Sequence, residues 1–151
     1  MENLQWTEDL NVGCEQIDEQ HKILVAMINV LINSLEGIIA KEFLLVSLTG
    51  LEDYARVHFE TEELYMKKFS YPEIEEQKIE HRNFIIKVAE FKKRFEDDEL
   101  KLHEIVDFLK NWLVNHVKTC DKKMEILFVK EEGPAKEDEN ATEVENSSED
   151  N

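Results

Sequence analysis

Four of the five histidines fall on the apolar faces of amphipathic helical patterns, where a polar side chain needs a partner. They are His21, His58, His81 and His116, and only His103 lies off such a face. A single histidine of this kind is more often a core residue with one satisfied hydrogen bond than a ligand. Burying several imidazoles without partners would cost on the order of a few kcal/mol each, comparable in sum with the stability of a domain. A shared metal ion would remove that cost, because each imidazole nitrogen would gain a ligand bond.

Two acidic side chains accompany these histidines. Glu62 follows His58 by four residues, so both side chains lie on one helical face, about 6 Å apart along the axis. The pair could chelate one metal ion, or Glu62 could bridge two. Asp121 follows His116 by five residues, and an ideal helix would leave those side chains about 140° apart around its axis. Periodicity alone therefore does not pair Asp121 with His116.

Helical periodicity predicts the elements that must position these residues. We predict helices from 18 to about 37 with Asp18 as N-cap, from about 41 to 69, from Pro72 at the first helical position to about 95, and from beyond the acidic turn at 96–99 towards Val129. Their apolar residues recur in steps of three and four, which is the pattern of a helix bundle. Residues 1–17 lack a sustained period and are predicted to form an irregular arm anchored by Trp6. Short turns between long helices predict an all-α, up-down-up-down four-helix bundle.

Composition favours a single helical domain and disfavours several partners. The chain of 151 residues is 42% hydrophobic and has only 4 Gly and 2 Pro, which favours long helices over many short strands. A formal net charge of -17 would repel phosphate backbones and anionic membrane surfaces, so we expect no nucleic acid and no membrane as partner. Neither a signal peptide nor a membrane-length apolar run is evident, which predicts a cytoplasmic location. There, Cys14 and Cys120 are expected to be reduced rather than bridged.

The C-terminal segment differs from the rest of the chain. Nine acids and one lysine lie between Glu131 and Asn151, with almost no apolar residue among them. Such a segment cannot bury enough surface to offset the entropy of ordering it. We therefore divide the chain into a helical bundle, residues 1–130, and a disordered acidic tail, residues 131–151.

Four segments together resemble the hemerythrin family over roughly residues 4–128. They are Ile17–Lys22 (IDEQHK), His58–Glu62 (HFETE), Glu80–Phe84 (EHRNF) and Asn111–Asp121 (NWLVNHVKTCD). The family pattern is one His on the first helix, HxxxE on the second, HxxxH on the third and HxxxxD on the fourth. These residues hold two irons bridged by an oxygen and by the Glu and Asp carboxylates. The resemblance therefore implies a non-haem diiron centre with oxo or hydroxo and carboxylate bridges.

The resemblance also implies how the ligands divide between the two irons. The implied ligands are His21 and His58 for the iron that binds dioxygen, His81 and His116 for the other iron, and Glu62 and Asp121 as bridges between them. It accounts for the five-residue spacing as well, since the Asp of the last helix is a bridging ligand in this family despite that spacing.

The third helix departs from the family pattern at Gln77. The segment Gln77–His81 (QKIEH) replaces HxxxH with QxxxH, so one imidazole of the second iron is absent. The side-chain oxygen of Gln77 could bind the iron instead, water could take the place, or Glu73, one turn earlier, could reach it. Neutral oxygen is a weaker ligand for ferrous iron than imidazole. The second iron is then either held less tightly or keeps an exchangeable position.

Other side chains near the implied centre have two possible roles. Cys120 projects from nearly the same face as His116, and its thiol is either a small buried hydrophobe or a redox-active or metal-contacting group. Four aromatic residues are expected in the core, where they would also line the ligand pocket and keep water from a bound ligand. These are Phe59, Tyr65, Phe84 and Trp112.

The function implied is reversible binding of dioxygen or a similarly small ligand, for oxygen storage, transport or sensing. We see no substrate pocket and no acid–base pair beyond the metal ligands, so a binding protein is favoured over an enzyme. One alternative is a diiron oxidoreductase acting on peroxide, nitric oxide or ferrous iron at the position opened by Gln77. Another is a bundle without its metals that serves as an acidic interaction protein through its tail. An iron count separates this last alternative from the other two.

Overall fold

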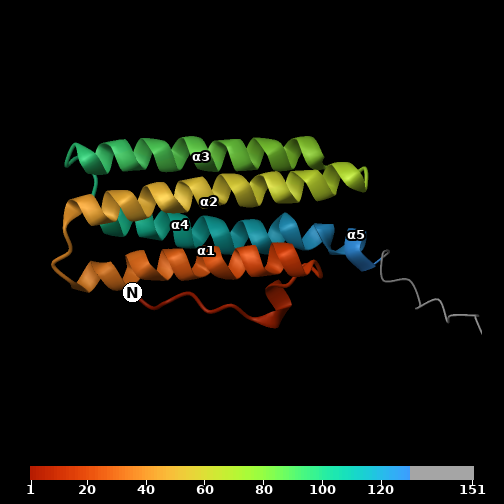
Figure 1. The fold of residues 1–151 in the computed structure, drawn as a ribbon, viewed down its shortest axis with the longest axis horizontal. Helices are drawn as coiled ribbons and strands as arrows, with labels where there is room; N and C mark the ends of the chain where they lie inside the picture. Colours follow the sequence, from red (N-terminus) through yellow and green to blue (C-terminus); the bar gives the residue numbers. More distant parts are fainter. Residues whose placement is uncertain (130–151) are drawn as a thin grey trace, which may run out of the picture.

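The computed structural model describes residues 1–129, which form helices and no strand (Figure 1). The elements are η1 (Glu8–Leu10), α1 (Glu15–Asn33), η2 (Ser34–Glu36), α2 (Lys41–Lys68), α3 (Ile74–Glu96), α4 (Leu102–Thr119), η3 (Asp121–Met124) and α5 (Glu125–Val129). Helices α1 and α3 each pack against both α2 and α4. Short connections reverse the chain after each of the first three long helices, so the predicted up-down-up-down bundle is confirmed. The tail predicted at 131–151 lies outside the described residues.

No helix within residues 1–129 is both long enough and apolar enough to cross a membrane.

The irregular N-terminal arm is confirmed, but Asp18 has a different role from the one predicted. Helix α1 begins at Glu15 with Cys14 in the N-cap position, so the prediction that Asp18 caps this helix was wrong. Its carboxylate instead accepts hydrogen bonds from the arm, 2.8 Å from the nitrogen of Val12 and 3.3 Å from that of Gly13. Gly13 has a φ of 88°, a conformation that side chains with a Cβ rarely adopt. Asp18 therefore fixes the arm to the first turns of α1.

The turn between α2 and α3 also differs from prediction, since α3 begins at Ile74 and not at Pro72. Ser70 has a φ of 52°. Its N–H donates a hydrogen bond to the carbonyl of Lys67, and the N–H of Tyr71 donates one to the carbonyl of Met66. This is the Schellman motif, which satisfies the last carbonyl groups of a helix. It carries residues 71–73 into the turn before the next helix starts.

The fourth helix is interrupted, contrary to the prediction that it continues towards Val129. Helix α4 ends at Thr119, and the chain continues as η3 from Asp121 and then as α5. The N–H of Cys120 still bonds to the carbonyl of His116, at 2.8 Å. The chain leaves the regular α-helical path at Cys120, where φ is -103° and ψ is -57°, and the Asp121 side chain that follows is fully buried.

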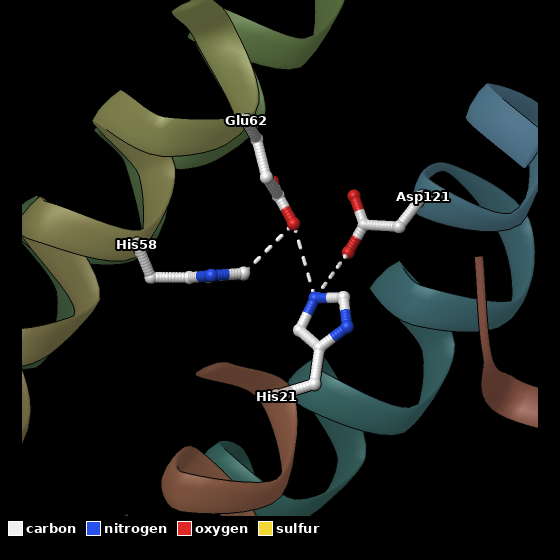
Figure 2. Close-up of side chains that lie close together, drawn as sticks. All are labelled: His21, His58, Glu62 and Asp121. Atoms are coloured by element: carbon white, nitrogen blue, oxygen red, sulfur yellow. Dashed lines mark hydrogen bonds and ion pairs between the residues drawn. The ribbon is translucent and has the colours of Figure 1, made fainter. Parts of the chain in front are cut away.

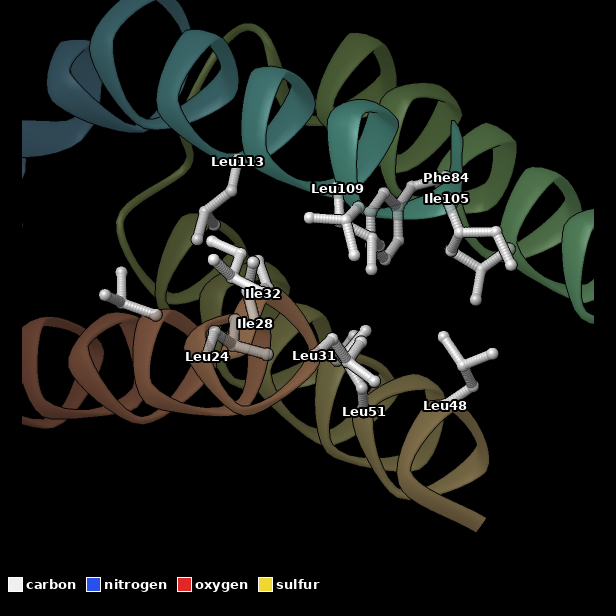
Figure 3. Close-up of a cluster of buried hydrophobic side chains, with 14 of the residues drawn as sticks. Leu24, Ile28, Leu31, Ile32, Leu48, Leu51, Phe84, Ile105, Leu109 and Leu113 are labelled. Atoms are coloured by element: carbon white, nitrogen blue, oxygen red, sulfur yellow. The ribbon is translucent and has the colours of Figure 1, made fainter. Parts of the chain in front are cut away.

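Two apolar clusters fill the bundle, and a polar layer separates them. The larger cluster joins all four long helices and includes Leu48, Leu109 and Ile105 (Figure 3). The smaller cluster closes one end of the bundle with residues from the arm, α2, η3 and α5. Three buried polar residues each lie along the chain between the two clusters: His21 between Leu24 and Ile17, Glu62 between Phe59 and Met66, and Asp121 between Val117 and Met124. The fold thus surrounds these polar groups with apolar side chains on both sides.

The role of Asp18 predicts a loss of stability when its carboxylate is removed. Asp18→Ala leaves the buried N–H of Val12 without its acceptor, so we expect the free energy of unfolding to fall by about 1–3 kcal/mol. Asp18→Asn keeps one acceptor oxygen and should lose less. Urea denaturation measures the change, with Glu19→Ala on the exposed face of the same helix as the control, expected within about 0.5 kcal/mol. A stability of Asp18→Ala equal to that of the control would show that the arm does not depend on this carboxylate.

Candidate metal centre

Two buried carboxylates form the middle of the polar layer, and Glu62 on α2 is one of them. Its Oε1 atom lies 3.0 Å from Nε2 of His21 and 2.8 Å from Nε2 of His58 (Figure 2). Its Oε2 atom lies 3.0 Å from Nε2 of His81 on α3. Glu62 therefore directs one oxygen to each side of the layer.

Asp121, at the start of η3, divides its oxygens in the same way. Its Oδ2 atom lies 3.1 Å from Nε2 of His21, and its Oδ1 atom lies 3.1 Å from Nε2 of His116. The Nε2 atoms of His116 and His81 are 3.3 Å apart. The break after α4 thus places the Asp121 carboxylate between histidines of α1 and α4, which the spacing of five in a continuous helix would not do.

The six residues make two groups that share their carboxylates. One group is His21, His58, Glu62 and Asp121, and the other is Glu62, His81, His116 and Asp121. Within each group, one ligand atom from every residue lies within 4.8 Å of the others, and all six side chains are buried. The structure therefore brings together the six residues that the sequence singled out, one histidine from each long helix. Two adjacent metal positions bridged by two carboxylates fit this arrangement.

Several polar atoms in this layer have no hydrogen-bond partner among residues 1–129. They include Oε2 of Glu62 and both carboxylate oxygens of Asp121. These oxygens lie 3.0–3.1 Å from imidazole nitrogens, which is within ion-pair distance. Leaving buried carboxylate oxygens without partners is costly, and cations held between the oxygens and the imidazoles would satisfy both. Nitrogen and carboxylate donors of this kind suit a first-row transition metal such as iron.

A chain of hydrogen bonds orients the His58 imidazole. The Thr61 hydroxyl donates to the carbonyl of Val57 at 3.0 Å, so its oxygen accepts from Nε2 of Gln20 at 3.2 Å. This leaves Oε1 of Gln20 to accept from Nδ1 of His58 at 2.8 Å. With its proton on Nδ1, neutral His58 presents the lone pair of Nε2 towards Glu62. A ligand histidine requires this tautomer, and such outer contacts commonly fix it.

Sequence reasoning missed Gln20 and Thr61 as functional residues. Both belong to motif segments, but both lie outside the apolar stripes of their helices, where polar residues are ordinarily solvated. Their contact joins α1 to α2, and helical periodicity carries no signal for pairing between two helices.

Burial and the two carboxylates together control the charges of the centre. Burial disfavours the imidazolium of His21, but the close carboxylates of Asp121 and Glu62 outweigh it and raise the pKa of His21 to about 9. Burial is likewise outweighed at His116, where the negative charge of Asp121 raises the pKa to about 11. Although burial opposes ionisation of Glu62, the nearby histidines hold the pKa of this carboxyl well below its usual value. The pKa of the Asp121 carboxyl is also lowered, because His116 and His21 outweigh its burial and the charge of Glu62. Both carboxyl groups are thus ionised and need positive charge beside them.

Aromatic rings pack against the imidazoles. Phe59 stacks on His81, with ring centres 4.0 Å apart and planes 6° apart, and Trp112 stacks on His116 at 4.3 Å and 13°. Trp6 from the arm lies over His21 at 5.6 Å. The anchor predicted for the arm is therefore also part of the wall around the centre. Of the other aromatic residues expected here, Phe84 contacts both Phe59 and Trp112, whereas Tyr65 contacts Phe128 in the smaller cluster.

Gln77 is buried on α3, one turn before His81, with 3% of its surface exposed. Its Oε1 atom has no hydrogen-bond partner within the described chain, as expected of an oxygen free to bind a cation. Glu73 was one of the two alternatives, beside water, and it is exposed at the surface. It accepts a hydrogen bond from the Tyr71 hydroxyl at 3.1 Å and lies 3.6 Å from Nζ of Lys123. The structure therefore favours Gln77 over Glu73 as the additional donor.

The cysteines and the remaining histidine are also placed. In the described part of the chain Cys14 and Cys120 are both free thiols, the first buried and the second partly exposed. Cys120 lies beside His116, and hydrogen bonding to this imidazole lowers the pKa of the thiol. His103 is exposed near the start of α4, on the surface of the bundle, as its position off the apolar stripe predicted.

Comparisons of the sequence and of the structure with known proteins point to the same family. The family model described as hemerythrin HHE cation binding domain matches residues 12–125. The chain is 37% identical to a bacteriohemerythrin of Pseudomonas paraeruginosa over 123 residues, which cover 80% of this chain and 78% of that protein. It is 28% identical to a bacteriohemerythrin of Clostridium acetobutylicum, over 78% of this chain and 95% of that one. A crystal structure of wild-type hemerythrin matches with a TM-score of 0.75 at 28% identity, over 83% of this chain and 97% of that chain.

The raised pKa values predict a pH dependence of the metal-free protein. An unfolded histidine titrates near 6.5, whereas His21 titrates at about 9 in the fold. The stabilisation from its charged form is therefore complete below pH 6.5 and is lost as pH rises through about 9, with the contribution of His116 lost towards pH 11. Between pH 6.5 and 9.5 we expect His21 alone to lower the free energy of unfolding by about 3 kcal/mol, and His116 to add a decrease of similar size.

The metal-loaded protein is the control, because bound metal replaces the proton on these nitrogens and should flatten the dependence over this range. Urea denaturation of both forms at several pH values measures the two slopes. Equal slopes with and without metal would show that the imidazoles do not exchange protons for metal.

Proposed function

The chain belongs to the hemerythrin family, and on that ground we propose that its buried centre holds two irons and binds dioxygen reversibly, for oxygen storage, transport or sensing. The observation that carries the proposal is the shared pair of carboxylates. Glu62 and Asp121 each direct one oxygen to one histidine group and the other oxygen to the second group. A single metal ion would leave one of the two groups without a cation.

In this proposal each group binds one iron. His21 and His58 would hold the first, His81 and His116 would hold the second together with the Gln77 oxygen, and the carboxylates of Glu62 and Asp121 would serve both. When bound, two ferrous ions supply the electrons that reversible dioxygen binding requires.

The chain's own residues orient these ligands and exclude water. Gln20 fixes the His58 tautomer, and the Phe59 and Trp112 rings hold the imidazoles of the second group in place. The apolar clusters on either side of the polar layer keep bulk water away, which protects a bound ligand from protons. The proposal also places the protein in the cytoplasm, where free thiols such as those of Cys14 and Cys120 remain reduced.

Removal of single ligands tests the centre. His58→Ala removes one imidazole and Glu62→Ala removes a bridge, so each should reduce iron from two per chain to less than about half that amount. Iron analysis and the oxygen-dependent absorption spectrum of protein loaded under identical conditions provide the measurement. His103→Ala changes an exposed histidine and should keep both irons and the spectrum. Full iron content in both ligand variants would contradict the site, and a wild-type protein without iron would favour the acidic interaction bundle.

Gln77 supports a second candidate function, a diiron oxidoreductase acting on peroxide, nitric oxide or ferrous iron. A neutral amide oxygen holds iron less firmly than imidazole does, so the second group can exchange that ligand for a small substrate. Reversible dioxygen binding needs a centre that does not turn over, whereas catalysis needs such an exchangeable position. The strength of the bond at residue 77 therefore separates the two functions.

Gln77→His tests this difference by restoring the family pattern at little change in volume. We expect the variant to retain its second iron several-fold longer against a chelator and its oxygenated form to decay more slowly. Chelator competition and the decay of the oxygen-dependent absorption measure the two effects, with Lys78→His on the same helix as a control for an added histidine. Identical iron retention and identical decay in Gln77→His and the unaltered protein would show that residue 77 is not a weak point of the centre.

A further inference from the structure

A pocket of about 380 Å³ opens beside the second histidine group, between the first turns of α3 and the region after α4. We call it the α3 pocket, and the residues that matter in its lining are Glu73, Glu76, Gln77, Glu80, Cys120 and Lys123. The volume is ample for a hydrated metal ion or several waters. The proposed function does not assign a role to this pocket.

The inner wall of the α3 pocket adjoins the metal centre. Gln77 precedes His81 by one turn of α3, and Cys120 lies beside His116 and next to Asp121 in the chain. On the same side, Oε2 of Glu80 lies 3.9 Å from Nδ1 of His116. The pocket therefore lies next to the His81–His116 group, with Gln77 and Cys120 in the wall between them.

The lining of the α3 pocket carries donors for a cation. The lining contains three carboxylates and one amine, that of Lys123. Its net negative charge attracts a small cation and repels an anion. Gln77, which is 97% buried, adds an oxygen that lacks a hydrogen-bond partner in the part of the chain described here. An unpaired buried oxygen behind an acidic opening is the arrangement expected where a cation passes inwards.

A second pocket touches the centre at His81 and has the opposite balance of charge. Its lining contains three bases, Arg56, Lys78 and Arg82, and two acids, Glu60 and Glu63. This pocket does not attract a cation, although it also borders a ligand histidine. The difference in charge distinguishes the two approaches to the same group.

From these observations we propose that the α3 pocket is the site at which ferrous iron is taken up into the centre, an inference that rests on the proposed function. The carboxylates of Glu73 and Glu76 collect the hydrated ion, and Oε1 of Gln77 receives it on the way to His81 and His116. Oxygen donors bind ferrous iron more weakly than imidazole does, so affinity increases from the pocket to the centre. A histidine at position 77 would bind the ion more firmly and release it more slowly.

Iron uptake by the metal-free full-length protein tests the proposal. Ferrous ammonium sulfate is added without oxygen at low salt, unbound metal is quenched with a chelator at successive times, and protein-bound iron is counted. The double variant Glu73→Gln and Glu76→Gln should take up iron about fivefold more slowly, because the substitutions remove two negative charges from the pocket lining. Lys123→Gln should take it up about twofold faster, and both differences should shrink at high salt.

Glu75→Gln is the matched control, because Glu75 lies on the same turn of α3 but outside the pocket and pairs with Lys78. It should stay within about twofold of the unaltered rate. Uptake by the double variant at the unaltered rate, or equal slowing by Glu75→Gln, would overturn the proposal, since the overall negative charge would then explain uptake.

The end point separates this proposal from the proposed function. All variants should reach two irons per chain and the oxygen-dependent spectrum, because none of them changes a ligand of the centre. Two irons with unchanged uptake rates would reject the α3 pocket alone. Failure of the unaltered protein to bind iron would instead reject the diiron function, and the uptake site with it.

Discussion

Two ionised carboxylates buried inside an apolar bundle are the constraint on which the rest of this structure depends. Glu62 and Asp121 are both fully buried, and their oxygens lie 2.8–3.1 Å from imidazole nitrogens. In a low-dielectric interior such charges persist only beside positive charge. Protons on His21 and His116 supply it in the metal-free protein, and metal ions supply it when bound. Folding and metal binding are therefore coupled through the same few atoms.

The irregular parts of the fold serve this constraint. Four regular helices bring one histidine each to the layer, and the Asp121 carboxylate joins them where the chain leaves the regular helix after Thr119. The N-terminal arm, fixed by Asp18, brings Trp6 over His21. An uninterrupted fourth helix would place Asp121 on another face and leave the layer with one carboxylate.

Helical periodicity was sufficient to predict the bundle and most of the centre, because a histidine or glutamate on an apolar stripe must face the interior. It succeeded for His58 and Glu62, which are one turn apart on α2. It could not place Asp121, because the end of α4 has no glycine or proline to mark it, and the family resemblance was needed there. The roles of Asp18 and Gln20 depend on contacts between segments distant in sequence. An aspartate near the start of a helix can cap the helix or bind the amides of the preceding loop. The local sequence pattern does not show which of these two roles Asp18 has.

Anomalous diffraction from crystals of the iron-loaded protein, collected at the iron absorption edge, tests the central claim most directly. We predict two adjacent iron peaks, one beside His21 and His58 and the other beside His81 and His116. Both peaks should contact the carboxylates of Glu62 and Asp121. A single peak in the polar layer, or two peaks that do not share these carboxylates, would contradict a diiron centre bridged by them.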